Sequence, residues 1–171
     1  MKHHHLELDA LRWLSWERKC VAVVAQRNIH HQLGNPDALG VTGGRYTVEV
    51  EIKRSMSDFR ANAFKRHITN RQIYIHIWPR QFYFMVPREL ADSVQPELPR
   101  WAGLLVSDFV GNAEVIVKAP VNLLARKVSL MEMRNMLRWM RNQIMVSEIK
   151  LYNNRQSQDW AWQEIDQDYS I

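Results

Sequence analysis

The sequence predicts a mixed α/β domain with a central mixed β-sheet flanked by helices. Segments with helical spacing alternate along the chain with short strand-like segments, in the order helix, strand, hairpin, helix, strand, short helix, strands, helix. The chain has 171 residues, of which 46% are hydrophobic and 24% are charged. This length and composition are typical of a globular protein with one sizeable core.

The first half of the predicted domain contains one helix and three strands. Apolar spacing predicts a helix over Leu8–Arg18, and the valine-rich segment Cys20–Ala25 predicts a strand. Two further strands, Asp37–Thr42 and Arg45–Lys53, flank the pair Gly43-Gly44. Adjacent glycines indicate a hairpin here, because glycine adopts positive φ at little cost.

The second half repeats this alternation of strands and helices. Its predicted elements are a helix capped by Ser57 and running to about His67, a strand over Gln81–Val86, a short helix over Arg88–Val94, a hairpin of Ala102–Val110 with Ala113–Lys118, and a helix capped by Ser129 and running to about Met145. A serine at the start of a helix can accept a backbone N–H of the first turn.

Both ends are expected to lie outside the domain, which we place at residues 8–150. Residues 1–7 include three adjacent histidines and are expected to be disordered or tag-like. Residues 151–171 form a polar, acidic tail.

Charge and cysteine content restrict the function classes. The net charge is +5, and the segment Ile52–Arg71 alone carries six cations against one anion. This favours a polyanionic partner. The single thiol, Cys20, excludes an internal disulfide and a zinc–thiolate cluster, which fits a cytoplasmic protein. No apolar stretch approaches the ~20 residues that span a bilayer, so we expect no membrane association.

The segment Thr47–Lys53 alternates strictly between apolar and polar residues. In a strand, such alternation puts Val48, Val50 and Ile52 on one face and Glu49, Glu51 and Lys53 on the other. An ordinary antiparallel strand with one solvated face shows the same pattern.

The length of the hairpin loop decides which residue lies opposite Glu51. A three-residue loop puts Asp37 there, whereas a two-residue loop puts Asp37 opposite Val50, and the sequence leaves both open. Directly opposed carboxylates form a good Mg²⁺ site, because this cation prefers oxygen ligands. Lys53, on the same face, can orient or help to deprotonate a water or stabilise charge on a phosphate.

The spacing Pro36-Asp37, thirteen residues, then Glu51-Ile52-Lys53 resembles the signature of the PD-(D/E)XK, or restriction-endonuclease-like, nuclease superfamily. The downstream segments Arg54–Phe59, Lys65–His67 and Phe82–Pro87 are similar to the MmcB-like branch, associated with DNA repair and phage nucleases. The similar region runs from about Leu8 to Pro120.

The resemblance implies a restriction-endonuclease-like domain with a Mg²⁺ or Mn²⁺ site. Asp37, Glu51 and the backbone carbonyl of Ile52 would be the metal ligands, and Lys53 would be the catalytic lysine. Some members add a glutamate on the first helix, for which Glu17 is the candidate, although a solvated helix charge explains it equally well.

Two further acids and a basic stretch complete the candidate set. Glu49 is either an extra ligand or, as we favour, a solvent-facing strand residue. Asp58 either faces the site or only complements the helix dipole. The candidate nucleic-acid-binding residues are Arg54, Arg60, Lys65, Arg66, His67 and Arg71.

Together, these expectations predict a metal-dependent DNA endonuclease that acts in DNA repair, recombination or phage DNA processing. Its expected partner is DNA, and a homodimer is one expected assembly. The alternative is a catalytically degenerate DNA-binding or protein-interaction module on the same fold. Metal-dependent cleavage distinguishes the two.

Overall fold

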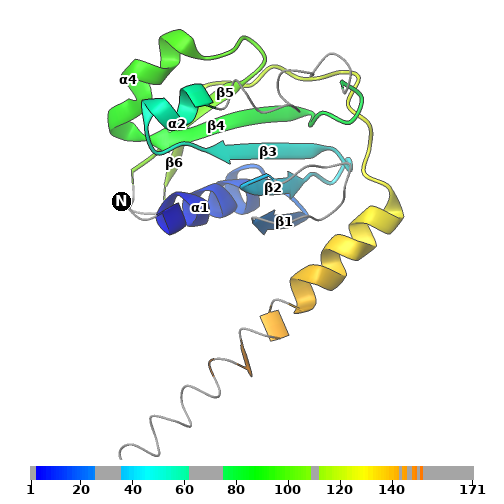
Figure 1. The fold of residues 1–171 in the computed structure, drawn as a ribbon. Coiled ribbons are helices and arrows are strands. Elements are labelled where there is room, and N and C mark those ends of the chain that lie inside the picture. Colours follow the sequence, from blue (N-terminus) through cyan, green and yellow to red (C-terminus); the bar gives the residue numbers. More distant parts are fainter. Residues whose placement is uncertain are drawn as a thin grey trace, which may run out of the picture. The chain divides into compact units, whose positions relative to one another are not determined.

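A computed structural model describes residues 3–25, 36–61, 75–108, 112–142, 144–145, 148–149 and 151. The chain divides into two compact units, Met1–Met133 and Arg134–Ile171. The β-sheet and the helices that cover it belong to the first unit (Figure 1).

The first unit is built on a six-stranded sheet whose spatial order is the same as the order in the sequence. Its strands are β1 (Ala22–Ala25), β2 (Ala38–Val41), β3 (Thr47–Ile52), β4 (Gln81–Pro87), β5 (Gly103–Ser107) and β6 (Ala113–Val117). The β3–β4 and β4–β5 pairs are parallel, and the other three pairs are antiparallel. The sheet is therefore mixed, which confirms the predicted fold class.

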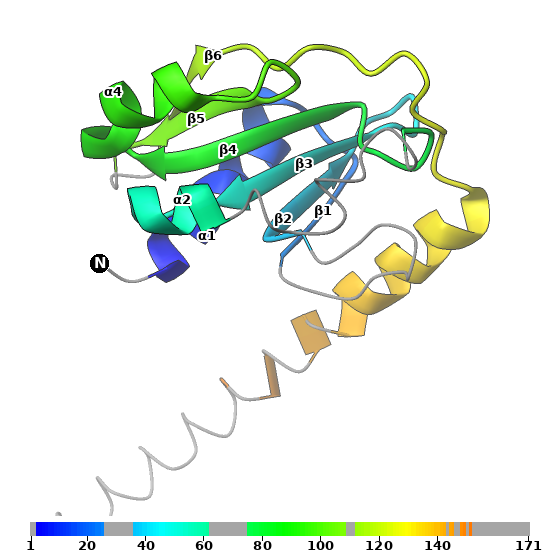
Figure 2. The same ribbon diagram turned by 45° about the horizontal axis from the view of Figure 1, so that its top comes forward.

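Helices cover both faces of this sheet (Figures 1 and 2). One face is covered by α1 (His3–Arg12) and its continuation, the π-helical η1 (Trp13–Glu17). The other face is covered by α2 (Met56–Ala61) and α4 (Ala91–Val94), and α4 lies between the short turns η3 (Arg88–Leu90) and η4 (Gln95–Glu97). Every residue of β3 and β4 is buried, as expected for strands with helices on both sides.

The core under α1 is held by large side chains and a close helix–strand approach. The rings of Trp13 and Tyr83 meet edge to face with centroids 5.0 Å apart. At Gly40 of β2, a Cβ atom would lie 2.6 Å from Cys20 Sγ and 2.9 Å from a Leu14 methyl carbon. Only glycine leaves room for η1 to pack this closely on β2.

The core under α2 and α4 is mostly aromatic. Phe84 of β4 packs edge to face against Phe59 of α2 and Phe82 of β4, with centroids 5.0 and 5.1 Å apart. Trp78 stacks on Phe82 at 5.4 Å. Phe59 is 6% exposed, so it fixes the position of α2 on the sheet next to the candidate site.

The N-terminus differs from the prediction. Residues 1–7 were expected to be disordered or tag-like, but α1 begins at His3 and Leu6 is fully buried. Leu6, Ala10 and Trp13 lie at helical spacing and share the same core. The apolar stripe therefore starts one turn earlier than the predicted helix.

The last predicted helix begins as expected. Ser129 Oγ accepts the N–H of Glu132 at 3.2 Å, and a carboxylate oxygen of Glu132 accepts the N–H of Ser129 at 2.7 Å. This reciprocal pair is a capping box, and residues 130 to 142 are helical. Among the described residues, no helix has both the length and the apolar character needed to cross a membrane.

Candidate active site

The β2–β3 hairpin brings Asp37 opposite Glu51. The register pairs Ala38 with Val50 and Leu39 with Glu49. One further step along the same register places Asp37, the residue before β2, across from Glu51. Directly opposed residues on antiparallel strands have Cβ atoms about 4.5–5.5 Å apart. The two carboxylates therefore belong to one site, as the longer-loop alternative predicts.

A three-residue loop sets this register. Thr42 donates its N–H to the carbonyl oxygen of Tyr46 at 2.9 Å, and Arg45 donates to the carbonyl oxygen of Thr42 at 2.8 Å. Arg45 has φ of 66°, the left-handed conformation that ends the common three-residue hairpin loop. The loop therefore consists of Gly43, Gly44 and Arg45.

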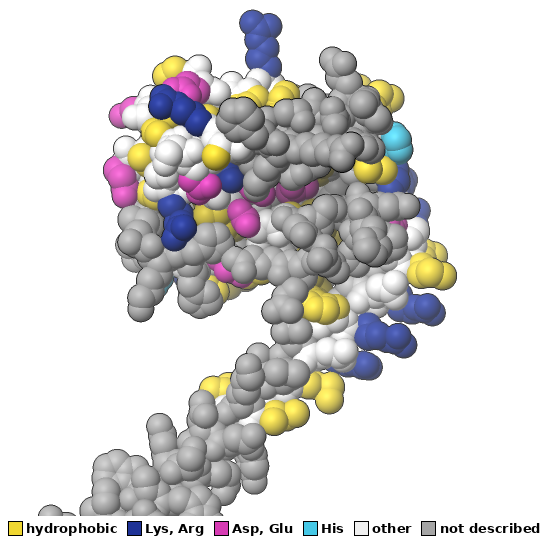
Figure 3. Space-filling model, viewed as in Figure 1, with side chains coloured by type: hydrophobic (Ala, Val, Ile, Leu, Met, Phe, Trp, Pro, Cys, Tyr) yellow, Lys and Arg dark blue, Asp and Glu magenta, His cyan; other side chains and the backbone are white. Residues whose placement is uncertain are grey.

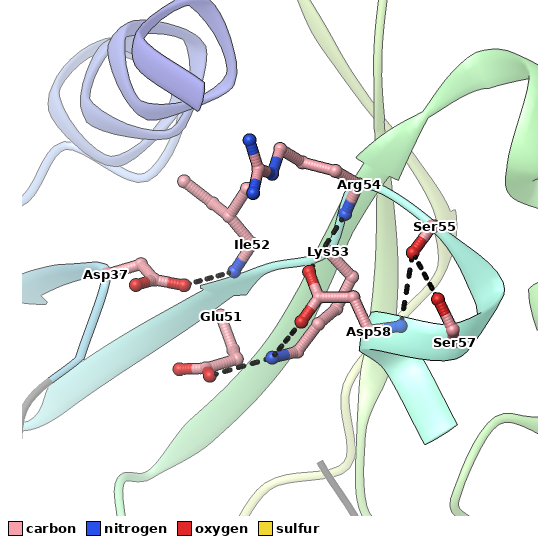
Figure 4. Close-up of polar contacts among 8 residues, drawn as sticks. All are labelled: Asp37, Glu51, Ile52, Lys53, Arg54, Ser55, Ser57 and Asp58. Atoms are coloured by element: carbon pink, nitrogen blue, oxygen red, sulfur yellow. Dashed lines mark hydrogen bonds and ion pairs between the residues drawn. The ribbon is translucent and has the colours of Figure 1, made fainter. Parts of the chain in front are cut away.

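The carboxylate of Asp37 is oriented by the backbone of β3. Its Oδ2 accepts the N–H of Ile52 at 2.7 Å (Figure 4). In an antiparallel pair, the N–H and C=O of one residue point toward the same neighbouring strand. We therefore expect the carbonyl of Ile52 to point to the side on which Asp37 lies, as the predicted metal shell requires.

Glu51 and Lys53 form a buried ion pair. Lys53 Nζ lies 3.1 Å from Glu51 Oε1, and Lys53 and Glu51 are 3% and 2% exposed. A lysine is almost never buried to this extent unless it is paired. The alternating strand places both side chains on one face.

Helix α2 adds Asp58 to this ion pair. Asp58 Oδ1 lies 3.7 Å from Lys53 Nζ, and Oδ2 accepts the N–H of Arg54 at 3.2 Å. Figure 4 shows the lysine nitrogen between the carboxylates of Glu51 and Asp58. Asp58 therefore both holds the start of the helix and contacts the candidate catalytic lysine.

The N-cap of α2 is Ser55, where Ser57 was predicted. Ser55 Oγ accepts the N–H of Asp58 at 3.1 Å, and the Ser55 carbonyl accepts the N–H of Phe59 at 2.9 Å. Ser57 Oγ instead forms a hydrogen bond with Ser55 Oγ at 2.9 Å. The missed signal was the spacing of Ser55 and Asp58, a serine followed three residues later by an acid.

The other two candidate acids lie in different environments. Glu49 was expected to face solvent, but it is 7% exposed and shares the face of Glu51. The polar face of β3 is thus buried at Glu49 as well as at Glu51 and Lys53. Glu17 is exposed and belongs to η1, which packs on the opposite face. The structure does not bring Glu17 to the Glu51–Lys53 pair.

Only part of the predicted DNA-binding stretch lies within the described residues. Arg54 and Arg60 are exposed. Arg60 Nε donates to Glu97 at 2.9 Å, and the hydrogen bonds to Glu97 raise the pKa of Arg60. Glu97 therefore competes with any phosphate for Arg60. Lys65, Arg66, His67 and Arg71 lie outside the described residues, as does the predicted end of this helix near His67.

The donor atoms at this site fit a hard divalent cation. The expected ligands are the carboxylates of Asp37 and Glu51 and the carbonyl of Ile52, all of them oxygens. Within the described part of the chain, no cluster of three or more His, Cys, Asp or Glu side chains could hold a metal. Two side chains and one carbonyl suit Mg²⁺, which keeps several of its waters.

Comparison with known proteins supports the fold alone. No family model matches the chain, and no curated protein is significantly similar to it. A solved structure of a protein of unknown function from Silicibacter pomeroyi is similar, with a TM-score of 0.57 and 20% sequence identity. The similarity covers 88% of this chain and 90% of the other.

Proposed function

We propose that this protein is a Mg²⁺- or Mn²⁺-dependent DNA endonuclease of the PD-(D/E)XK type. The observation that supports the proposal is the buried Glu51–Lys53 pair directly across the hairpin from Asp37. Two carboxylates and a lysine on one sheet face are the side chains that metal-dependent phosphodiester hydrolysis uses. The sequence resemblance adds a role in DNA repair, recombination or phage DNA processing.

Each residue has a distinct part in this chemistry. Asp37 and Glu51, with the carbonyl of Ile52, would hold the cation, which when bound polarises the phosphate and lowers the pKa of a water. Lys53 would orient the attacking water and stabilise the negative charge that develops on the phosphate. Asp58, 3.7 Å from the lysine nitrogen, is a positioning residue for Lys53.

The test is cleavage of labelled single-stranded, duplex, flap and four-way-junction DNA in Mg²⁺, Mn²⁺ or EDTA. We expect metal-dependent products from the wild type and a loss of at least about 100-fold in Lys53→Met and Asp37→Asn. Lys118→Met, which neutralises a lysine outside the site, is the matched control and should cleave normally. Thermal unfolding of each variant separates lost chemistry from lost folding.

Three results would contradict the proposal. Cleavage that persists in both variants would show that a contaminant or another site is responsible. No cleavage by the folded wild type in either metal, together with salt-sensitive DNA retention, would identify a degenerate DNA-binding module. No cleavage and no DNA binding would favour a protein-interaction module.

A further inference from the structure

A second group of charged side chains surrounds Tyr46 at the other end of β3. The guanidinium of Arg80 lies 4.2 Å from the centroid of the Tyr46 ring, and the ammonium of Lys127 lies 5.6 Å from it. Arg45, the last residue of the hairpin loop, precedes Tyr46 directly. We call Tyr46, Arg45, Arg80 and Lys127 the Tyr46 platform.

Backbone hydrogen bonds hold the three segments of the platform together. Arg80 donates its N–H to the carbonyl of Thr47 at 2.9 Å, and Val128 donates to the carbonyl of Arg45 at 2.7 Å. Asn122 donates to the carbonyl of Arg80 at 2.8 Å. The segment that carries Lys127 is therefore fastened both to the hairpin and to the start of β4. These hydrogen bonds fix the backbone segments from which the cationic side chains project.

The cations of the platform have no acidic partner among the described residues. Within the described residues, no acidic side chain lies within ion-pair distance of Arg45, Arg80 or Lys127. Arg126, the neighbour of Lys127, is by contrast held by Glu132 through two hydrogen bonds of 2.9 and 2.6 Å. Figure 3 shows Lys and Arg side chains at the right-hand edge of the first unit, the hairpin end of the sheet.

The ring of Tyr46 keeps two of these cations close together despite their repulsion. Both charged groups lie within about 6 Å of one centroid, the range in which an aromatic face attracts a cation. They are at most about 10 Å apart, the sum of those two distances. Both cations can therefore contact one short stretch of a phosphate backbone.

We propose that the Tyr46 platform binds the phosphate backbone of a nucleic acid. The six residues of β3 separate it from Lys53 by about 20 Å, or about six nucleotides. A substrate long enough to reach both would thus be held at two points. The choice of DNA as the probe rests on the proposed function, whereas the platform itself does not depend on catalysis.

The experiment measures binding of a fluorescein-labelled DNA duplex by anisotropy in EDTA, where metal-dependent cleavage is absent. In Arg80→Gln/Lys127→Gln we expect Kd to rise about 10-fold, and the slope of log K against log salt to fall by about 2 between about 50 and 200 mM NaCl. Tyr46→Leu should weaken binding, whereas Tyr46→Phe, which keeps the ring, should restore it.

The control is Arg12→Gln/Arg88→Gln, which removes the same amount of charge. Arg12 lies 4.0 Å from Asp9, and Arg88 pairs with Glu114, so each cation has a carboxylate neighbour that competes with a phosphate. An equal loss of DNA affinity in this control and in the platform variant would overturn the proposal, because net charge alone would then explain binding. Displacement of the DNA by poly-glutamate as effectively as by unlabelled duplex would also overturn it.

The two proposals fail independently. Loss of cleavage in Lys53→Met with unchanged binding supports the catalytic site and leaves the platform intact. Unchanged binding in Arg80→Gln/Lys127→Gln, in a protein that cleaves DNA, rejects the platform alone.

Discussion

Asp37 is a carboxylate whose orientation is set by a backbone group. Its Oδ2 accepts the N–H of Ile52 at 2.7 Å, so the side chain is held before any cation arrives. An asparagine can still accept this hydrogen bond through its amide oxygen, but it has no negative charge. The two properties of this residue, folding contact and charge, can therefore be tested separately.

At this position we predict that Asp37→Asn leaves the melting temperature without metal within about 2 °C of the wild type, since the hydrogen bond persists. The stabilisation by Mg²⁺ should disappear, because metal affinity falls at least about 10-fold. Thermal unfolding with and without Mg²⁺ measures both. Asp92→Asn, at an exposed acid on α4, serves as the control. Equal Mg²⁺ stabilisation in Asp37→Asn would contradict the metal-ligand assignment.

At the scale of the element, two serines near α2 have different roles although they are two residues apart. Ser55 accepts the N–H of Asp58, whereas Ser57 hydrogen-bonds only to Ser55 among the described contacts. We predict that Ser55→Ala lowers the free energy of unfolding by about 1 kcal/mol, the usual cost of losing an N-cap. Ser57→Ala should change it by less than about 0.5 kcal/mol. Urea denaturation of both variants decides the matter, and a larger effect of Ser57→Ala would contradict the cap assignment.

The capping box of the last helix includes a strongly perturbed acid. The hydrogen bonds from Arg126 lower the pKa of Glu132 from its usual 4.5 to about 2. Because the pKa is lower in the folded state, the ionised form stabilises the fold. That stability is complete above pH 4.5 and is lost as the pH falls to about 2.

The free energy of unfolding of the wild type should fall between about pH 4.5 and 2. We predict that this fall is smaller by roughly 2 kcal/mol in Glu132→Gln. Urea denaturation at several pH values measures it. The matched control is Glu97→Gln, because Glu97 pairs with Arg60 at an exposed surface, where an ion pair contributes little. If both variants changed the pH dependence of the free energy of unfolding equally, the Arg126–Glu132 pair would contribute no more than an exposed ion pair.

At the scale of the whole molecule, the sheet must fit closely against the segment at Ala119, just after β6. A Cβ at Gly103 would lie 2.5 Å from two ring atoms of Tyr83 and 2.6 Å from the backbone nitrogen of Ala119. Neither neighbour is the end of a flexible chain, so the substitution forces β4, β5 and the segment at Ala119 apart. By contrast, nothing lies within 4 Å of a Cβ at Gly43.

We therefore predict that Gly103→Ala lowers the free energy of unfolding by about 1–3 kcal/mol through overpacking. Gly43→Ala, at the open hairpin loop, should shift it by less than about 0.5 kcal/mol. Chemical denaturation of the pair tests this difference. Equal stability of the two variants would show that the contact at Gly103 can relax without cost.

Local pattern predicted most of the elements. The alternation of Val48, Val50 and Ile52 identified β3, and Ser129, predicted as a helix cap, does cap the last helix. Neighbours in sequence determine both features, because side-chain direction in a strand and N–H groups at a helix start are set within a few residues.

The candidate site could be predicted only in part. The sequence named Asp37, Glu51 and Lys53, and the residue types alone indicated metal-dependent chemistry. It left the hairpin register open, because Gly43-Gly44 permits both loop lengths. It placed Glu49 in solvent, because an alternating strand looks the same whether its polar face is covered or not.

By itself, then, the sequence determined which segments become strands and helices and which residues share a strand face. Only the tertiary structure decided that Asp37 lies across from Glu51, that Lys53 is buried with it, and that Asp58 reaches the lysine from another element. The physical reason is that burial depends on the packing of distant segments, whereas the register depends on which of the two loop lengths the hairpin adopts. Here the contact between Phe59 of α2 and Phe84 of β4 fixes α2 on the sheet. Arg45, in the left-handed conformation, ends the three-residue loop.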